Sequence, residues 1–321
     1  MPLHSVGTPL LWIGFLVFVC AMLALDLGVF HRQAHAITTK EALGWSGVWI
    51  TLALLFNLGL YFLFGADHAL EFTAGYLIEK ALAVDNIFVF MIVFRTFAVP
   101  KNEQHRVLFW GVLGALVMRA IFIFAGGAVL QRFHWAMYVF GGLLIVTGVR
   151  LLMKRQQEES HPENSPVLRF FARIMPATPE FAGDHFTIVK EGKRYATPLL
   201  LALVAIEVSD LVFAIDSIPA IFAVTTDPFL VFTSNIFAIL GLRSLYFVLA
   251  DVVDRFVYLK PALAFVLLFV GVKMCIVDLY KVPIPVSLGV IVGILAIAVL
   301  ASMWRRKHAS KNETRELTPT L

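Results

Sequence analysis

Long apolar runs, separated by short polar segments, recur along the whole chain. A run of about 20 apolar residues is the length that a helix needs to cross the hydrocarbon core of a bilayer. The pattern therefore predicts an all-α polytopic membrane protein, with residues 1–321 forming a single transmembrane domain. Nine spans are predicted, at residues 9–30, 43–64, 69–94, 107–131, 135–153, 196–222, 229–250, 261–280 and 284–304.

The longest polar segment between spans covers residues 154–195. Its first half is rich in charge, Pro and Ser, which predicts an irregular loop. Its end, FTIVKEGKRY at residues 186–195, has two short β-branched or aromatic runs around a Glu-Gly turn and predicts a small β-hairpin. Residues 305–321 are polar and are expected to form a disordered tail.

Three short sequence blocks of spans 3–5 recur in spans 6–8 at offsets of 124, 123 and 125 residues. Because each copy contains three spans, the second copy must enter the membrane in the opposite orientation. This pattern predicts an inverted 3+3 repeat, residues 69–153 and 196–280, with a substrate site near the midplane between the copies. The matched blocks are Gly114–Arg119 with Ala238–Arg243, Ile145–Arg150 with Leu268–Lys273, and Asp85–Phe88 with Asp210–Phe213.

The charged residues support a membrane protein and indicate its orientation. Hydrophobic residues make up 60% of the chain and charged residues 15%, against about 50% and 25% in soluble domains. Of the 26 Lys and Arg residues, 19 fall in loops on the side of the C-terminus, and only Arg132 and Lys281 fall in loops on the other side. Basic residues collect in cytoplasmic loops, so the N-terminus is expected outside and the C-terminus in the cytoplasm. Because basic cytoplasmic loops explain the net charge of +4, the charge does not indicate a nucleic-acid partner.

Carboxylates lie in the middle of two of these apolar spans. Each acid at the bilayer centre costs about 2.5–3.5 kcal/mol on insertion scales, and such residues usually mark an ion path or a bound cation. Residues three, four or seven apart share a helix face, so Glu79 faces the same way as Asn86, and Glu207 the same way as Asp210 and Ser217. Asp85 and Asp216 lie off these faces unless a helix unwinds, and Pro219 is expected to kink the sixth span.

Every side chain in this group offers oxygen, which suits Mg²⁺, Ca²⁺ and Mn²⁺ rather than zinc or copper. We therefore expect a hard divalent cation as the transported substrate and no resident cofactor, with protons as a candidate counter-ion. Span positions alone do not determine the oligomeric state. The predicted metal ligands are Glu79, Asp85, Asn86, Glu207, Asp210, Asp216, Ser217 and Asn235.

Two structural alternatives apply to the same residues. Arg119 and Arg243 also lie inside spans and can form buried ion pairs with two of the acids, while Lys80 can snorkel or neutralise a third. Asn235 can equally serve as a helix-to-helix hydrogen-bonding group. Pairing would still leave a surplus of acid in the third and sixth spans.

Other function classes have less support. The chain lacks the GxGD, HExxH and GxSxG patterns of intramembrane proteases, so we expect no enzyme activity. A redox modulator that transports nothing is a second alternative, although Cys20 and Cys275 lie far apart in the sequence and form no CxxC motif.

Three motifs resemble the TerC family of bacterial integral membrane proteins, and within it the Alx-like branch. They are Glu79–Asn86 (EKALAVDN), Glu207–Pro219 (EVSDLVFAIDSIP) and Thr233–Arg243 (TSNIFAILGLR). The resemblance implies a bacterial inner-membrane protein that exports manganese, with Glu79, Asp85, Glu207, Asp210 and Asp216 as its acids. It also implies the alternatives of a redox or stress modulator or a tellurite-resistance protein, because members of the family carry those descriptions.

Overall fold

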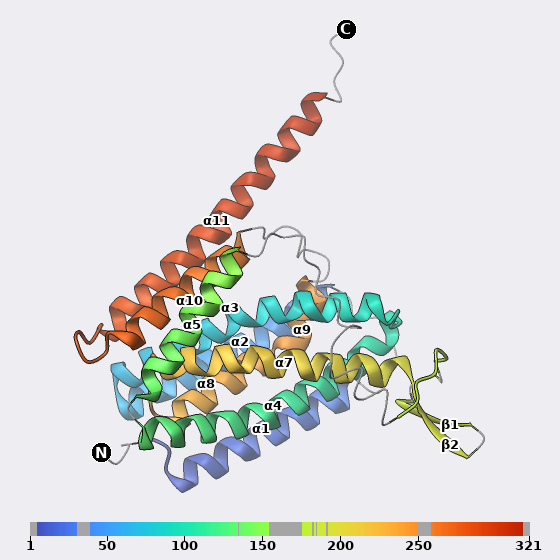
Figure 1. The fold of residues 1–321 in the computed structure, drawn as a ribbon, viewed down its shortest axis with the longest axis horizontal. Coiled ribbons are helices and arrows are strands. Elements are labelled where there is room, and N and C mark those ends of the chain that lie inside the picture. The colour runs from blue at the N-terminus through green and yellow to red at the C-terminus, as the bar shows by residue number, and fades with distance from the viewer. Residues whose placement is uncertain are drawn as a thin grey trace.

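The computed structural model describes residues 5–30, 39–133, 135–153, 175–181, 183, 185–190, 192–249 and 258–316. Helices dominate this part of the chain (Figure 1). They are α1 (Pro9–Phe30), α2 (Thr39–Phe64), α3 (Ala66–Thr96), α4 (Lys101–Arg132), α5 (Ala136–Met153), α7 (Pro198–Phe222), α8 (Pro228–Leu240), α9 (Leu242–Leu249), α10 (Leu259–Cys275) and α11 (Ile284–Glu316).

Every range predicted as a span contains a helix, and α8 and α9 together fill the seventh. Five helices, α2, α4, α5, α7 and α11, are long and apolar enough to cross a membrane, and the α8–α9 pair adds a sixth if it is one broken span. Their outer faces expose large apolar side chains, such as Phe62 on α2 and Ile297 on α11. In water such surfaces would be costly, whereas lipid covers them. The chain is therefore a multi-pass helical membrane protein.

The predicted hairpin is confirmed. Strand β1 (Thr187–Lys190) pairs antiparallel with β2 (Lys193–Ala196). Gly192 in the turn has a φ of 75°, a left-handed conformation that glycine adopts at little cost. The side chain of Thr197 donates to the carbonyl of Phe186 at 2.9 Å, which fixes the hairpin directly before the first turn of α7.

The expected disordered tail is wrong for most of its length, because α11 continues to Glu316. Residues 305–316 contain no Gly or Pro and are rich in helix-forming residues, so nothing in the sequence ends the helix where the apolar run ends. In Figure 1 this part of α11 projects well beyond the other helices.

α7 continues past Pro219 to Phe222, so the helix does not unwind at the residue where we expected a kink. A break lies at Gly241, where α8 and α9 meet at 41°. Lys80 of α3 donates to the carbonyl of Ala238 at 2.9 Å in the last turn of α8. A Cβ at position 241 would lie 2.8 Å from the Lys80 ammonium nitrogen, so a larger residue there would require the Lys80 side chain to shift.

The helices of the two predicted repeats are interleaved. α3 packs against α7 and α8 of the second half, and α4 packs against α7 and α8 in turn. α3, α4 and α7 run side by side through the molecule (Figure 1). This arrangement brings the polar positions of α3, α4, α7 and α8 to one place.

α5 and α10 form the closest helix pair. A Cβ at Gly148 would lie 2.9 Å from the carbonyl oxygen of Ala264, and a Cβ at Gly271 would lie 2.8 Å from that of Gly141. Small residues of this kind let two backbones approach within van der Waals contact, which is how helices associate in lipid.

Candidate functional site

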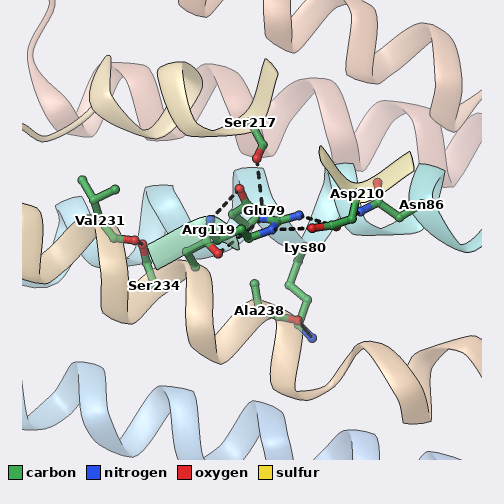
Figure 2. A network of polar contacts seen from close by, with 10 residues as sticks. Glu79, Lys80, Asn86, Arg119, Asp210, Ser217, Val231, Ser234 and Ala238 are labelled. Carbon is green, nitrogen blue, oxygen red and sulfur yellow. Dashed lines mark hydrogen bonds and ion pairs between the residues drawn. The ribbon is translucent and has the colours of Figure 1, made fainter. Parts of the chain in front are cut away.

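An arginine and two carboxylates meet in the middle of the bundle (Figure 2). The Arg119 guanidinium of α4 donates through Nη1 to Glu79 of α3 at 2.5 Å. It also holds Asp210 of α7 with two bonds, Nη2 to Oδ1 at 3.0 Å and Nε to Oδ2 at 3.4 Å. One side chain thus joins acids from both predicted repeats.

Three neutral side chains complete the network. Asn235 of α8 donates to the second oxygen of Glu79 at 2.9 Å and accepts from Arg119 Nη1 at 3.4 Å. Ser217, two turns beyond Asp210, accepts from the same nitrogen at 3.5 Å. Asn86 of α3 donates to Asp210 Oδ1 at 3.2 Å. All four carboxylate oxygens of Glu79 and Asp210 therefore accept at least one hydrogen bond.

The charged groups are almost completely removed from the surface, with Glu79 1%, Arg119 2% and Asp210 2% exposed. A buried charge is tolerated only when it is paired and hydrogen-bonded. Taking one partner out of such a pair costs about 3–5 kcal/mol, because it leaves the other charge buried and uncompensated. Two carboxylates and one guanidinium leave this cluster with a net charge of −1.

One amide oxygen at the site has no hydrogen-bond partner. Asn86 is 1% exposed, and its Oδ1 is buried and unbonded. Leaving a buried acceptor unsatisfied costs about 1–3 kcal/mol, so such groups call for an explanation. A side-chain amide oxygen beside a carboxylate is the type of ligand that a hard divalent cation takes.

The structure places the remaining predicted ligands differently. Glu207 is half-buried and lies against Gly114 of α4, where a Cβ would overlap its carboxylate group. Asp216 is also half-buried, and it accepts a hydrogen bond at 2.9 Å from Thr147 of α5, so it does not join the network around Asp210. The side chain of Asp85 lies outside the described part of the structure.

The positively charged alternatives have separate outcomes. Arg119 does form buried ion pairs, as one alternative predicted, and it pairs with both Glu79 and Asp210. Lys80 follows Glu79 directly in the sequence but turns toward α8 and binds the Ala238 carbonyl, and its ammonium lies 5.7 Å from the ring centre of Tyr76. It therefore neutralises none of the acids of this cluster.

Among the described residues, no group of three or more His, Cys, Asp and Glu side chains is arranged to hold a metal ion. The Arg119 guanidinium occupies the space between Glu79 and Asp210. The oxygen atoms that contact it come from the two carboxylates, the Asn235 amide and the Ser217 hydroxyl. Oxygen is the ligand atom that hard cations take in proteins.

A second polar cluster, which the sequence did not single out, lies at the start of α8. Asp227 caps α8 by accepting from the Phe229 amide at 2.8 Å. It also accepts from the Ser5 hydroxyl at 2.8 Å and the Val6 amide at 2.7 Å, which ties the segment before α1 to this helix. An Asp immediately before a Pro at the first helical position is a recognisable capping signal.

The profile of the integral membrane protein TerC family matches residues 64–310, which include α3, α4, α7 and α8 with all the residues of the network. The chain belongs to the TerC family. A relative from Myxococcus xanthus, named "Uncharacterized membrane protein STKORF319", is 58% identical to this TerC protein over 309 residues, which cover 96% of this chain and 97% of the relative.

Another TerC relative comes from Escherichia coli (strain K12) and is named "Putative membrane-bound redox modulator Alx". It is 50% identical over 311 residues, which cover 94% of this chain and 97% of the relative. A third, "Uncharacterized membrane protein" from Rickettsia bellii, is 42% identical over 295 residues. These names state no transported substrate. No solved structure matches the chain.

Proposed function

We propose that this TerC protein exports a hard divalent cation from the bacterial cytoplasm, with Mn²⁺ as the substrate. The observation that carries the proposal is the buried pair of Glu79 and Asp210, which come from α3 and α7 and are held by Arg119 and by the amide groups of Asn235 and Asn86. The choice of Mn²⁺ among hard cations rests on the resemblance to the TerC family. The donor set itself suits Mg²⁺ and Ca²⁺ as well.

The proposed mechanism is alternating access of an inverted repeat, α3–α5 and α7–α10. The glycine contacts between α5 and α10 support this symmetry. In the predicted repeat, an offset of 123 residues relates Gly148 to Gly271. The same offset relates Gly141 to Ala264. Gly148 packs on Ala264 while Gly271 packs on Gly141, so each contact is the counterpart of the other, as a two-fold relation requires.

In the proposed topology nine spans cross the inner membrane, with the N-terminus outside and the hairpin β1–β2 in the cytoplasm. α3, which carries Glu79, is then one of these nine spans. It is not among the helices that are apolar enough to cross a membrane by composition, because it contains several charged residues. The charge of Glu79 is tolerated there because Arg119 and Asn235 bind it within the bundle.

The experiment measures cellular manganese by elemental analysis in an exporter-deficient bacterium under Mn²⁺ load. Cells carry the wild type, Asp210→Asn, or no protein, with membrane expression checked for each. We expect the wild type to lower cellular manganese and Asp210→Asn to leave it at the level of the empty strain. Asp227→Asn is the matched control, because it changes a buried acid outside the site to a residue that also caps helices well. An expressed wild type that leaves manganese unchanged would refute the export proposal.

The printed names of the Alx relatives favour a second candidate, a redox modulator. Thiol-based redox chemistry in this chain would use Cys20 of α1 or Cys275 of α10, both of which carry free thiols. The double variant Cys20→Ser/Cys275→Ser, tested in the same strains, separates the two candidates. Export that persists without either thiol supports transport, and a phenotype lost with the thiols supports the redox function.

A further inference from the structure

We propose that the Arg119 guanidinium is a tethered competitor of the transported cation, which holds the Glu79–Asp210 pair when the site is empty of substrate and must be displaced for a cation to bind. This inference rests on the proposed export function. It assigns to Arg119 the role of deciding which cations enter the site.

The first argument is the number of lone pairs available. Arg119 binds three of the four carboxylate oxygens, Glu79 Oε2 and both Asp210 oxygens. The fourth, Glu79 Oε1, accepts from Asn235. A hard cation needs oxygens at about 2.0–2.6 Å, with lone pairs directed at the ion. Each oxygen has two lone pairs, but an ion that bridges Glu79 and Asp210 needs the lone pairs turned toward the space that the guanidinium fills. The guanidinium must therefore leave that space for the ion to bridge the two acids.

The second argument is charge. The two carboxylates with Arg119 have a net charge of −1, and adding a divalent cation without moving the arginine would give +1. Exchanging the arginine for a divalent cation brings the two carboxylates and the ion to zero, while the tethered guanidinium carries its charge to a new position. Because net charge at the buried acids is costly, the exchange is favoured over joint occupancy when the displaced guanidinium reaches water or another acceptor.

The same reasoning excludes monovalent cations. Na⁺ or K⁺ in place of the guanidinium leaves the net charge at −1 and removes the bidentate hydrogen bonds to Asp210, which are among the stronger polar contacts in proteins. A divalent cation gains one unit of charge over the arginine and a monovalent cation gains none. Arg119 therefore selects for charge 2+.

A further observation concerns an unused acceptor at the site. Asn86 donates to Asp210 through Nδ2, while its own Oδ1 is buried without a hydrogen-bond partner. The N–H groups of Arg119 donate to Glu79, Asp210 and neighbouring side chains, and none of these bonds is to the Asn86 oxygen. A metal ion bound by Asp210 would take up this oxygen.

The test compares wild type, Arg119→Met, Arg119→Lys and Arg243→Met, all purified in detergent. Mn²⁺ and Na⁺ binding are measured by calorimetry, and Mn²⁺ transport is measured in proteoliposomes. Arg243 is the matched control, because it is a buried arginine (4% exposed) at the position that the repeat pairs with Arg119. Thermal unfolding of each variant shows whether it is folded.

We expect Arg119→Met to bind Mn²⁺ about 10- to 100-fold more tightly than the wild type, because the internal competitor is gone. We also expect it to bind Na⁺ at concentrations that leave the wild type empty and to transport Mn²⁺ more slowly, because nothing replaces the ion on release. Arg243→Met is expected to lower stability and to keep Mn²⁺ affinity within about twofold of the wild type.

A folded Arg119→Met that binds Mn²⁺ no more tightly than the wild type would overturn the proposal. If that variant does not fold, Arg119→Lys decides the question, since its single ammonium cannot make the bidentate contact. Tighter Mn²⁺ binding by the lysine variant supports the proposal, and unchanged affinity overturns it. If neither the wild type nor the variants bind or transport Mn²⁺, the export proposal itself has failed.

Discussion

At the scale of single residues, the most consequential group is a neutral one. The Asn86 amide nitrogen donates to Asp210, while its amide oxygen has no hydrogen-bond partner. The side chain is buried, so water at the surface does not satisfy that oxygen. The unsatisfied oxygen destabilises this structure, whereas in a cation-bound state the same oxygen would be a ligand. Replacing Asn86 should therefore lower the affinity for the cation while changing the stability little.

We predict that Asn86→Leu raises the Mn²⁺ concentration for half-maximal transport about tenfold, which corresponds to the loss of about 1.4 kcal/mol from one ligand. The thermal midpoint should change little, because the variant removes an unsatisfied acceptor together with one hydrogen bond. Transport into proteoliposomes and thermal unfolding in detergent measure the two effects.

Asn57→Leu is the control for this experiment. Asn57 of α2 likewise donates one hydrogen bond, to Thr73 at 2.8 Å, and has a buried oxygen without a partner. It lies outside the acid network, so its replacement should leave the Mn²⁺ dependence of transport unchanged. Equal effects of the two substitutions on transport would show that the Asn86 oxygen is not a ligand.

The residues of the site could largely be predicted from the sequence, because helical spacing assigns each acid to a face. The faces of Glu79 with Asn86 and of Asp210 with Ser217 do turn inward and meet. The same spacing places Asp216 off these faces in a regular helix, and it stays out of the network because α7 remains helical through Pro219. Its partner Thr147 could not be predicted, because a contact with a different helix is not encoded at the acid itself.

At the scale of helices, apolar length gave the position of each element but not always its end. α11 continues beyond its apolar run because helix propensity does not depend on hydrophobicity. The break at Gly241 was not predicted either, because glycine is common within membrane helices. What makes it a break is Lys80, whose ammonium approaches from α3.

The glycine contacts between α5 and α10 give a prediction at this scale. Gly148→Ala should lower the free energy of unfolding by about 1–3 kcal/mol, because its methyl group meets the Ala264 carbonyl and the Leu268 side chain. Gly271→Ala should do the same, as expected for its symmetric counterpart. Denaturation of the purified protein in mixed micelles measures both.

Gly142→Ala is the control on the same helix, because a Cβ at that position meets nothing within 4 Å. An alanine there should leave stability unchanged or raise it by a fraction of a kcal/mol, since alanine is about 0.5–1 kcal/mol better than glycine in a helix. If Gly148→Ala proves as stable as Gly142→Ala, the close approach of α5 and α10 is not a source of stability.

At the scale of the whole molecule, the orientation in the membrane follows from the distribution of basic loops. The hairpin carries Lys190, Lys193 and Arg194 and should lie in the cytoplasm, whereas Lys281, between α10 and α11, should lie outside. Both lysines at 193 and 281 are exposed, so each can be replaced by a reporter cysteine.

We predict that, in a background with Cys20 and Cys275 replaced by Ser, a membrane-impermeant maleimide labels Lys281→Cys in intact spheroplasts. Lys193→Cys should be labelled only after the membrane is permeabilised. Labelling of Lys193→Cys in intact spheroplasts would reverse the proposed orientation and, with it, the direction of export.

The contact between Glu79 and Arg119 has a consequence for biosynthesis. Glu79 and Arg119 lie on two successive membrane helices, so both leave the ribosome long before Asp210, Ser217 and Asn235. An acid and a base that insert separately each cost several kcal/mol, whereas a pair formed on insertion carries no net charge into the lipid. α3 and α4 can therefore enter the bilayer with the charges of Glu79 and Arg119 already paired. Asp210 then joins an arginine that is already held in place, and the site is completed by the later half of the chain.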